Sequence, residues 1–109
     1  MGDRRRKLLE ELERYYRGCG WPVERADDGT VRAVGTGGVT WIGMPVVASD
    51  LESASFEHRV VMLAGLRMDE SGARCPLELL PDADCEAEVR AVLERLRLCE
   101  RVSVYSLAA

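Results

Sequence analysis

The chain is poor in the residues that build most recognisable active sites. Its 109 residues include one histidine, His58, and one lysine, Lys7. The richest glycine cluster, Gly35 with Gly37 and Gly38, has no following lysine and joins two expected strands rather than a strand and a helix. A phosphate-binding loop needs helix amides facing the phosphate, so this cluster predicts a hairpin turn instead.

The four cysteines, at positions 19, 75, 85 and 99, form no C-x-x-C pair, and no histidine lies at ligand spacing from any of them. A structural zinc site needs closely spaced pairs that preset its tetrahedron, so we expect no metal and no cofactor. Free, half-buried thiols are the favoured state. A Cys75–Cys85 or Cys19–Cys99 disulfide is the alternative.

Long apolar runs are also missing. After Arg4–Lys7 only Leu8 and Leu9 are apolar before Glu10 interrupts, so we expect no signal peptide. The longest uncharged stretch, residues 33–49, contains Gly, Thr and Pro and is too short to span a bilayer. We therefore expect a cytoplasmic protein, a location in which disulfides are rare.

The formal net charge is −4, which argues against a nucleic-acid-binding surface. The exception is the basic run Arg4–Lys7, but Glu10, Glu11 and Glu13 follow it directly. We expect a solvated start of a helix there, and an arm that binds a polyanion is the alternative.

Length and composition indicate one globular domain over residues 1–109. The chain is 47% hydrophobic and 31% charged, which is ordinary for a folded protein and unlike a disordered one. A chain of this length can bury a hydrophobic core that is stable without disulfide bonds or a structural metal ion.

In the first half of the chain, the spacing of apolar residues changes from the helical period of about 3.6 to the strand period of two. Residues 4–17 predict a helix, because apolar residues recur at helical spacing, with Gly18, Gly20 and Pro22 ending it. Residues 21–25, 30–34 and 39–47 then predict three antiparallel strands, joined by turns at 27–29 and 36–38.

The second half is ambiguous between residues 49 and 68. A short helix from Asp50 to about Phe56 is possible, and a hairpin of residues 59–68 and 73–80 about a turn at 69–72 is favoured. The rival interpretation is one helix from Asp50 to Ala64. A last helix follows residues 81–84, and residues 102, 104 and 105 predict a final strand.

The expected fold is therefore of the α+β class. It has an N-terminal helix, an antiparallel meander of about five strands, a C-terminal helix packed on one face, and a final short strand.

Two groups of residues are candidates for function. His58 with Cys75 or Glu57 is the one pairing that could support catalysis, although no motif links them. Aromatic side chains suit binding surfaces because they bury large rigid area, so the binding candidates are Trp21, Trp41, Tyr15 and Tyr16. A place in the core is the competing interpretation of these four.

The segments Leu8–Tyr16, Gly20–Glu24, Asp28–Val31 and Val39–Ile42 follow the pattern helix, glycine, strand, acidic-glycine turn, strand. This arrangement resembles the fold shared by type III secretion chaperones and YbjN-like sensory-regulator proteins, over the first half of the chain. The resemblance implies a non-enzymatic domain that binds a peptide or partner protein, often as a homodimer.

Three hypotheses follow. The leading one is a bacterial, chaperone-like or regulatory module that binds an extended peptide or protein at a sheet edge, near an apolar rim at Trp21 and Trp41. The second is a small enzyme or accessory subunit that uses His58 and a cysteine of depressed pKa. The third is a regulatory factor that binds a polyanion through Arg4–Lys7, with steep salt dependence.

Overall fold

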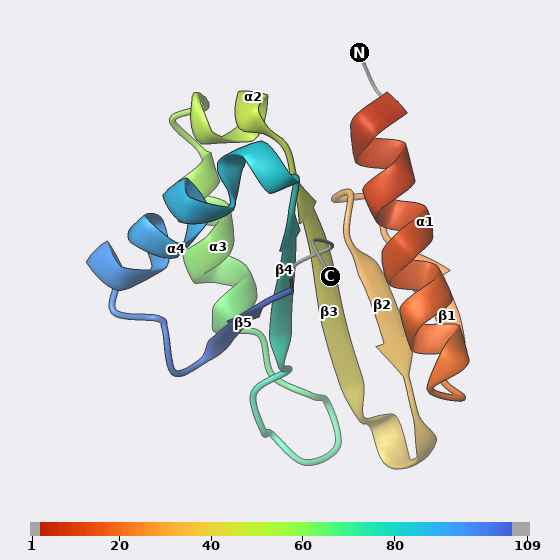
Figure 1. Ribbon diagram of the computed structural model, residues 1–109. Helices are drawn as coiled ribbons and strands as arrows, with labels where there is room; N and C mark the ends of the chain where they lie inside the picture. The colour runs from red at the N-terminus through yellow and green to blue at the C-terminus, as the bar shows by residue number, and fades with distance from the viewer. Residues whose placement is uncertain (1–2, 106–109) are drawn as a thin grey trace.

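The computed structural model describes residues 3–105 of the chain. A five-stranded sheet lies between two helical layers (Figure 1). Helix α1 covers one face, and helices α3 and α4 cover the other. The principal elements are α1 (Asp3–Gly18), β1 (Val23–Arg25), β2 (Val31–Val34), β3 (Thr40–Val46), α2 (Ala48–Leu51), α3 (Phe56–Ala64), β4 (Leu77–Pro81), α4 (Glu86–Arg95) and β5 (Val102–Val104).

The predicted N-terminal helix is confirmed as α1. Its buried residues include Leu8, Leu12 and Tyr16, which lie at i, i+4 and i+8 along one face. The helix ends at Gly18, and Gly20 has a φ of +88°, a conformation that glycine adopts without steric cost.

The three-stranded meander is also confirmed. β1 pairs antiparallel with β2, and β2 pairs antiparallel with β3. Successive side chains of β3 point to opposite faces, so Trp41 packs on the α1 side while Ile42 and Met44 belong to the core under α3 and α4.

The expectation of a purely antiparallel sheet is wrong, because β4 and β5 join it in parallel. β3 pairs parallel with β4, and β4 pairs parallel with β5, so the sheet is mixed. Parallel neighbours need a crossover connection, usually a helix, and α2 with α3 supplies it between β3 and β4.

The favoured hairpin of residues 59–68 and 73–80 is therefore not formed. Phe56, Val60, Leu63 and Ala64 are buried at helical spacing, so α3 matches the later part of the rival helix. The expected turn at 69–72 does exist, closed by one isolated antiparallel bridge between Arg67 and Arg74.

The C-terminal helix and final strand are present, with details that differ from the expectation. α4 follows a 3-10 turn, Ala83–Cys85, that Asp82 caps by accepting a hydrogen bond from the Ala83 N–H. β5 then returns to the end of the sheet, beyond β4. The helix shares its face with α3 instead of covering it alone.

The sheet separates two apolar clusters. The larger cluster lies under α3 and α4 and includes Ile42, Val60, Leu79, Val89 and Leu93. The smaller cluster lies under α1 and contains Leu8, Leu12, Tyr16, Val31, Ala33 and Leu80. No helix in the part of the chain described is long and apolar enough to cross a membrane.

Candidate binding site at the β5 edge

The outer side of β5 is an open sheet edge. β5 is last in the strand order, so among residues 3–105 its one strand neighbour is β4. The Tyr105 N–H donates to the Leu79 carbonyl of β4 at 2.8 Å. Because successive residues of a strand direct their backbone groups to opposite sides, the N–H and C=O of Val104 point away from β4, towards the outside of the sheet.

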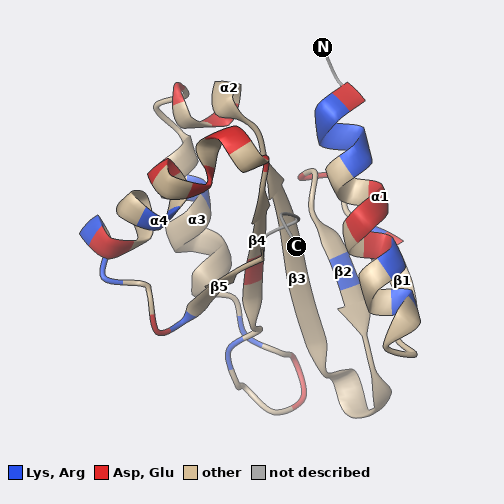
Figure 2. Ribbon diagram, in the orientation of Figure 1, with Lys and Arg blue, Asp and Glu red and all other residues tan. Residues whose placement is uncertain are grey.

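The two edges of the sheet differ in how they are protected. At the β1 edge, Pro22 precedes the strand, Glu24 is exposed, and Arg25 forms a two-pronged ion pair with Glu13 of α1. Proteins use proline and charge in this way to discourage pairing with other chains. β5 reads Val-Ser-Val and carries no charged residue (Figure 2). The strand itself therefore lacks the residue types that protect β1, and the nearest charge is the exposed Arg101 directly before it.

A groove of about 430 Å³ runs beside β5 on the α4 side of the sheet. Its apolar part comes from Leu93 of α4, Cys99 and the strand itself. Arg90 and Glu94, one helical turn apart on α4, add one charge of each sign. A side chain from a strand paired outside Val104 would point into this groove, because side chains directly opposite each other in adjacent strands share a face.

The other face of the β5 end carries a cluster of tyrosines around a buried carboxylate. Tyr16 donates a hydrogen bond to Glu78 Oε1 at 2.6 Å, and Tyr105 donates one to Glu78 Oε2. Glu78 is only 5% exposed. Burial, reinforced by the hydrogen bonds to Glu78 and its charge, raises the pKa of both phenols above the usual range.

Tyr15 is the exposed member of this cluster. Its ring centroid lies 5.0 Å from that of Tyr105 and 5.5 Å from that of Tyr16. Half of Tyr15 is exposed, whereas Tyr16 is buried in the core under α1. Of these two predicted binding residues, Tyr15 is thus exposed next to Tyr105, and Tyr16 is a buried residue that contacts Glu78.

The two tryptophans that the sequence predicts as binding residues lie away from the β5 edge. Trp21 and Trp41 pack against each other with ring centroids 6.0 Å apart, and both are half-buried. Trp21 also lines a hollow of about 470 Å³ with Pro22 and Gly35. Since Trp21 leads into β1, at the opposite end of the strand order from β5, the tryptophans and the β5 edge are separate surfaces.

The residues of the catalytic hypothesis do not form a reactive pair. His58 is exposed on α3, while Cys75 and Cys85 are buried. Burial raises the pKa of both thiols, which is the opposite of what an activated cysteine requires. Among residues 3–105, no group of His, Cys, Asp or Glu side chains is arranged to hold a metal ion.

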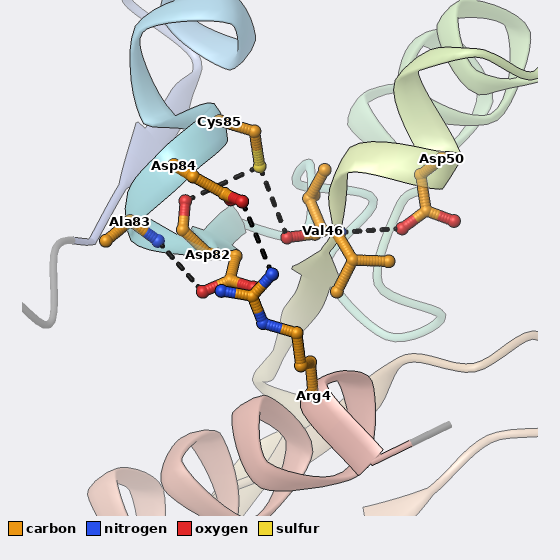
Figure 3. Close-up of polar contacts among 8 residues, drawn as sticks. Arg4, Val46, Asp50, Asp82, Ala83, Asp84 and Cys85 are labelled. Atoms are coloured by element: carbon orange, nitrogen blue, oxygen red, sulfur yellow. Dashed lines mark hydrogen bonds and ion pairs between the residues drawn. The ribbon is translucent and has the colours of Figure 1, made fainter. Parts of the chain in front are cut away.

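The basic N-terminal run is largely paired with acids. Arg4 Nε lies 2.7 Å from Asp82 Oδ2, and Arg4 also reaches Asp84 at 3.3 Å (Figure 3). Arg5 forms a 2.6 Å ion pair with Asp50, which is 9% exposed. These acids follow β3 and β4, so the arginines fasten the start of α1 to the ends of two central strands.

Searches against protein-family models, curated proteins and solved structures found no match to this chain. The resemblance to type III secretion chaperones and YbjN-like proteins accordingly stays a prediction.

Sequence reasoning missed two parts of the site. It anticipated the final strand but not its edge position, which depends on the parallel pairing with β4. It also passed over Glu78, although a single acid within Leu77-Glu78-Leu79-Leu80 signals a buried carboxylate that needs hydrogen-bond partners.

Proposed function

We propose that the protein is a non-catalytic, cytoplasmic module that binds an extended segment of a partner protein by adding it to β5. The observation that carries this proposal is the outward-facing N–H and C=O of Val104, on a strand without charged residues and beside a groove that Leu93, Arg90 and Glu94 help to line. In strand addition, backbone hydrogen bonds supply affinity, and pockets for alternate side chains supply selectivity.

The two faces of the β5 end define the kind of segment that fits. Side chains on one face of the added strand would enter the groove beside Leu93, where apolar groups are favoured. Those on the other face would pass near Tyr105 and the exposed ring of Tyr15. A segment with alternating apolar residues and no proline at its paired positions is the expected ligand.

Two observations favour this function over its rivals. The raised thiol pKa values of Cys75 and Cys85 count against a cysteine-based enzyme. The ion pairs of Arg4 and Arg5 offset much of the positive charge that a polyanion-binding arm would need.

The test is fluorescence anisotropy with a labelled seven-residue peptide of alternating threonine and valine. Val104→Pro removes the outward N–H and should weaken binding about tenfold or more. Val104→Ala keeps the N–H and should bind within a few-fold of the parent protein. A peptide with N-methylated backbone amides should not bind, since it cannot donate to the edge.

The matched control is Val23→Pro on the other edge. Val34 N–H donates to Pro22 and Ala26 N–H donates to Thr30, so the backbone groups of Val23 point outward from β1. This variant should bind like the parent protein. Equal loss in Val23→Pro and Val104→Pro, or binding of the N-methylated peptide, would contradict strand addition at β5.

Tryptophan fluorescence distinguishes binding at β5 from binding at the apolar rim of Trp21 and Trp41 that the sequence predicts. Because Trp21 and Trp41 lie away from β5, bound peptide should leave the emission of the protein unchanged. A shift in emission on binding would place the ligand at the Trp21–Trp41 surface instead.

A further inference from the structure

The arginines of this chain are unevenly paired with acids. Most of them form ion pairs, and those without an acidic partner among residues 3–105 are Arg59, Arg67, Arg74, Arg97 and Arg101. Arg59 on α3 donates to the Asp28 carbonyl, and the other four lie in the segments that lead into β4 and β5. Since these two strands are parallel, both begin at the same end of the sheet (Figure 1). Arginines without acidic partners therefore gather where β4 and β5 begin.

The backbone at Arg97 is strained. Among the described residues, Arg97 is the one residue other than glycine with a positive φ, 58°. Its N–H donates to the Glu94 carbonyl at 3.0 Å, and Leu98 N–H donates to the Leu93 carbonyl at 2.9 Å. These two bonds end α4 in the motif that favours glycine at this position, because glycine has no Cβ to clash. What an arginine offers here in place of glycine is therefore its side chain.

A tight turn between Arg97 and Arg101 ends the open part of the β5 edge. The Leu98 carbonyl accepts from Arg101 N–H at 3.0 Å and from Val102 N–H at 2.9 Å. Val102 N–H cannot donate to an added strand, whereas the N–H of Val104 can. A segment paired with Val104 that continues past the start of β5 must therefore be held there by side chains, and both arginines are exposed.

We infer that the segment added to β5 runs antiparallel to it and carries acidic residues at its carboxyl end, which pair with Arg97 and Arg101. The inference rests on the proposed function, because it names the ligand of the same edge. Antiparallel pairing is more stable per residue than parallel pairing, and it directs the carboxyl end of the segment towards the start of β5. Since Arg101 stands three residues before Val104, the acids would lie about three residues beyond the one opposite Val104. Guanidinium groups bind carboxylates through two parallel hydrogen bonds.

Two acids near this end oppose the attraction and are outnumbered. Glu94 lines the groove and Glu100 lies in the turn, and neither forms an ion pair with Arg97 or Arg101 in the described part of the chain. Arg74, three residues before β4, adds a further positive charge at the same end of the sheet. The balance here is positive, although the whole chain carries a net charge of −4. A carboxylate is therefore attracted to the start of β5 more than to the surface at large.

The experiment is fluorescence anisotropy with three labelled peptides that share the threonine–valine core and are capped at both ends. One has two glutamates after the core, one has two glutamines there, and one has two glutamates before the core. The parent protein should bind the first peptide about fivefold more tightly than the second, and this preference should disappear at about 1 M salt. The third peptide should bind like the second, because its acids lie at the wrong end.

The variants assign this preference to particular side chains. Arg101→Gln and Arg97→Gly should each reduce the preference for the first peptide to about twofold or less. Arg97→Gly should also unfold at the same temperature as the parent or a higher one, because glycine relieves the positive φ. Arg101→Glu should instead prefer a core followed by two lysines. Arg59→Gln is the matched control, since it removes an arginine that also lacks an acidic partner, and it should keep the preference of the parent.

The outcomes separate this inference from the proposed function. Peptides that all bind equally well, with binding still lost in Val104→Pro, overturn the acidic end and leave strand addition standing. Tighter binding of the peptide with glutamates before its core overturns the antiparallel orientation, and equal losses in Arg59→Gln and Arg101→Gln overturn the local pairing. Binding that depends on Arg101 but survives Val104→Pro, or no binding of any peptide, removes the proposed function and the inference with it.

Discussion

The hydroxyl of Tyr16 on α1 donates a 2.6 Å hydrogen bond to the buried carboxylate of Glu78 on β4. Tyr105, just after β5, donates to the other oxygen of the same carboxylate. One side chain therefore joins α1, β4 and the end of β5. This arrangement bears on the proposed binding site, because it holds Tyr105 in place beside the β5 edge.

Tyr16→Phe should destabilise the protein by about 1–3 kcal/mol, because it leaves one oxygen of a buried carboxylate without its partner. Urea unfolding, followed by circular dichroism, measures this change. The triple variant Tyr16→Phe, Glu78→Leu and Tyr105→Phe should recover part of the loss, since it removes the buried charge together with both of its donors. A Tyr16→Phe protein as stable as the parent would show that the contact contributes nothing.

Alkaline pH should unfold the protein through the same cluster. The folded-state pKa values of Tyr16 and Tyr105 lie above the ordinary value of 10.0. Their contribution is complete below pH 10 and is lost as pH rises above it, because the unfolded chain releases phenolic protons that the folded chain retains. Tyrosinate absorbance and circular dichroism should change together above pH 10. Full ionisation of all three tyrosines in a protein that remains folded would contradict the prediction.

Gly43 allows α1 to approach β3 closely. A Cβ at this position would lie 2.9 Å from the Tyr16 hydroxyl oxygen and 3.2 Å from Leu12 Cδ2. Gly43→Ala should therefore cost about 1–3 kcal/mol by overpacking. Gly18→Ala is the matched control, since nothing lies within 4 Å of its Cβ position, and it should cost nothing. Thermal unfolding of the two variants compares them directly.

The meander could be predicted because its signals are local. Gly29 closes the β1–β2 turn with a φ of +84°, and the alternation of Trp41 with Ile42 assigns the two faces of β3. The pairing of β3 with β4 is different, since it joins residues 35 positions apart, such as Ile42 and Leu77. Nothing in either segment alone distinguishes a parallel from an antiparallel partner, and the apolar run before β4 suits a strand or a buried helix equally well.

The same ambiguity of local signals explains why the sequence favoured a strand where the structure has α3, at residues 56–64. Val60 and Val61 are adjacent β-branched residues, typical of a strand, but α3 buries Val60 completely and leaves Val61 49% exposed. The open edge at β5 likewise follows from the strand order and from no single residue.

Paired alanine substitutions test the helical assignment of α3. Val60→Ala should cost about 2 kcal/mol by removing a buried side chain, whereas Val61→Ala should change stability by less than about 0.5 kcal/mol. Val60→Ala with Leu63→Ala should cost more than either alone, because both residues face the same core. Equal costs at positions 60 and 61 would instead fit a strand buried on both faces. The variants are compared by the denaturant concentration at which half of the protein is unfolded, provided that the slope of unfolding free energy against denaturant is the same for all of them.

Cysteine labelling links the fold to the proposed site. Cys19 and Cys99 are exposed, while Cys75 and Cys85 are buried with raised thiol pKa values. A neutral maleimide should therefore modify two of the four thiols rapidly in the folded protein and all four after unfolding. Cys99 lines the groove beside β5, so a bound peptide should slow its modification, and Cys19 at the end of α1 should react at an unchanged rate. Mass spectrometry of the labelled protein, digested after quenching, reports each site separately. Protection of Cys19 in place of Cys99 would move the ligand from β5 to the Trp21 side of the molecule, and protection of neither would leave the groove empty.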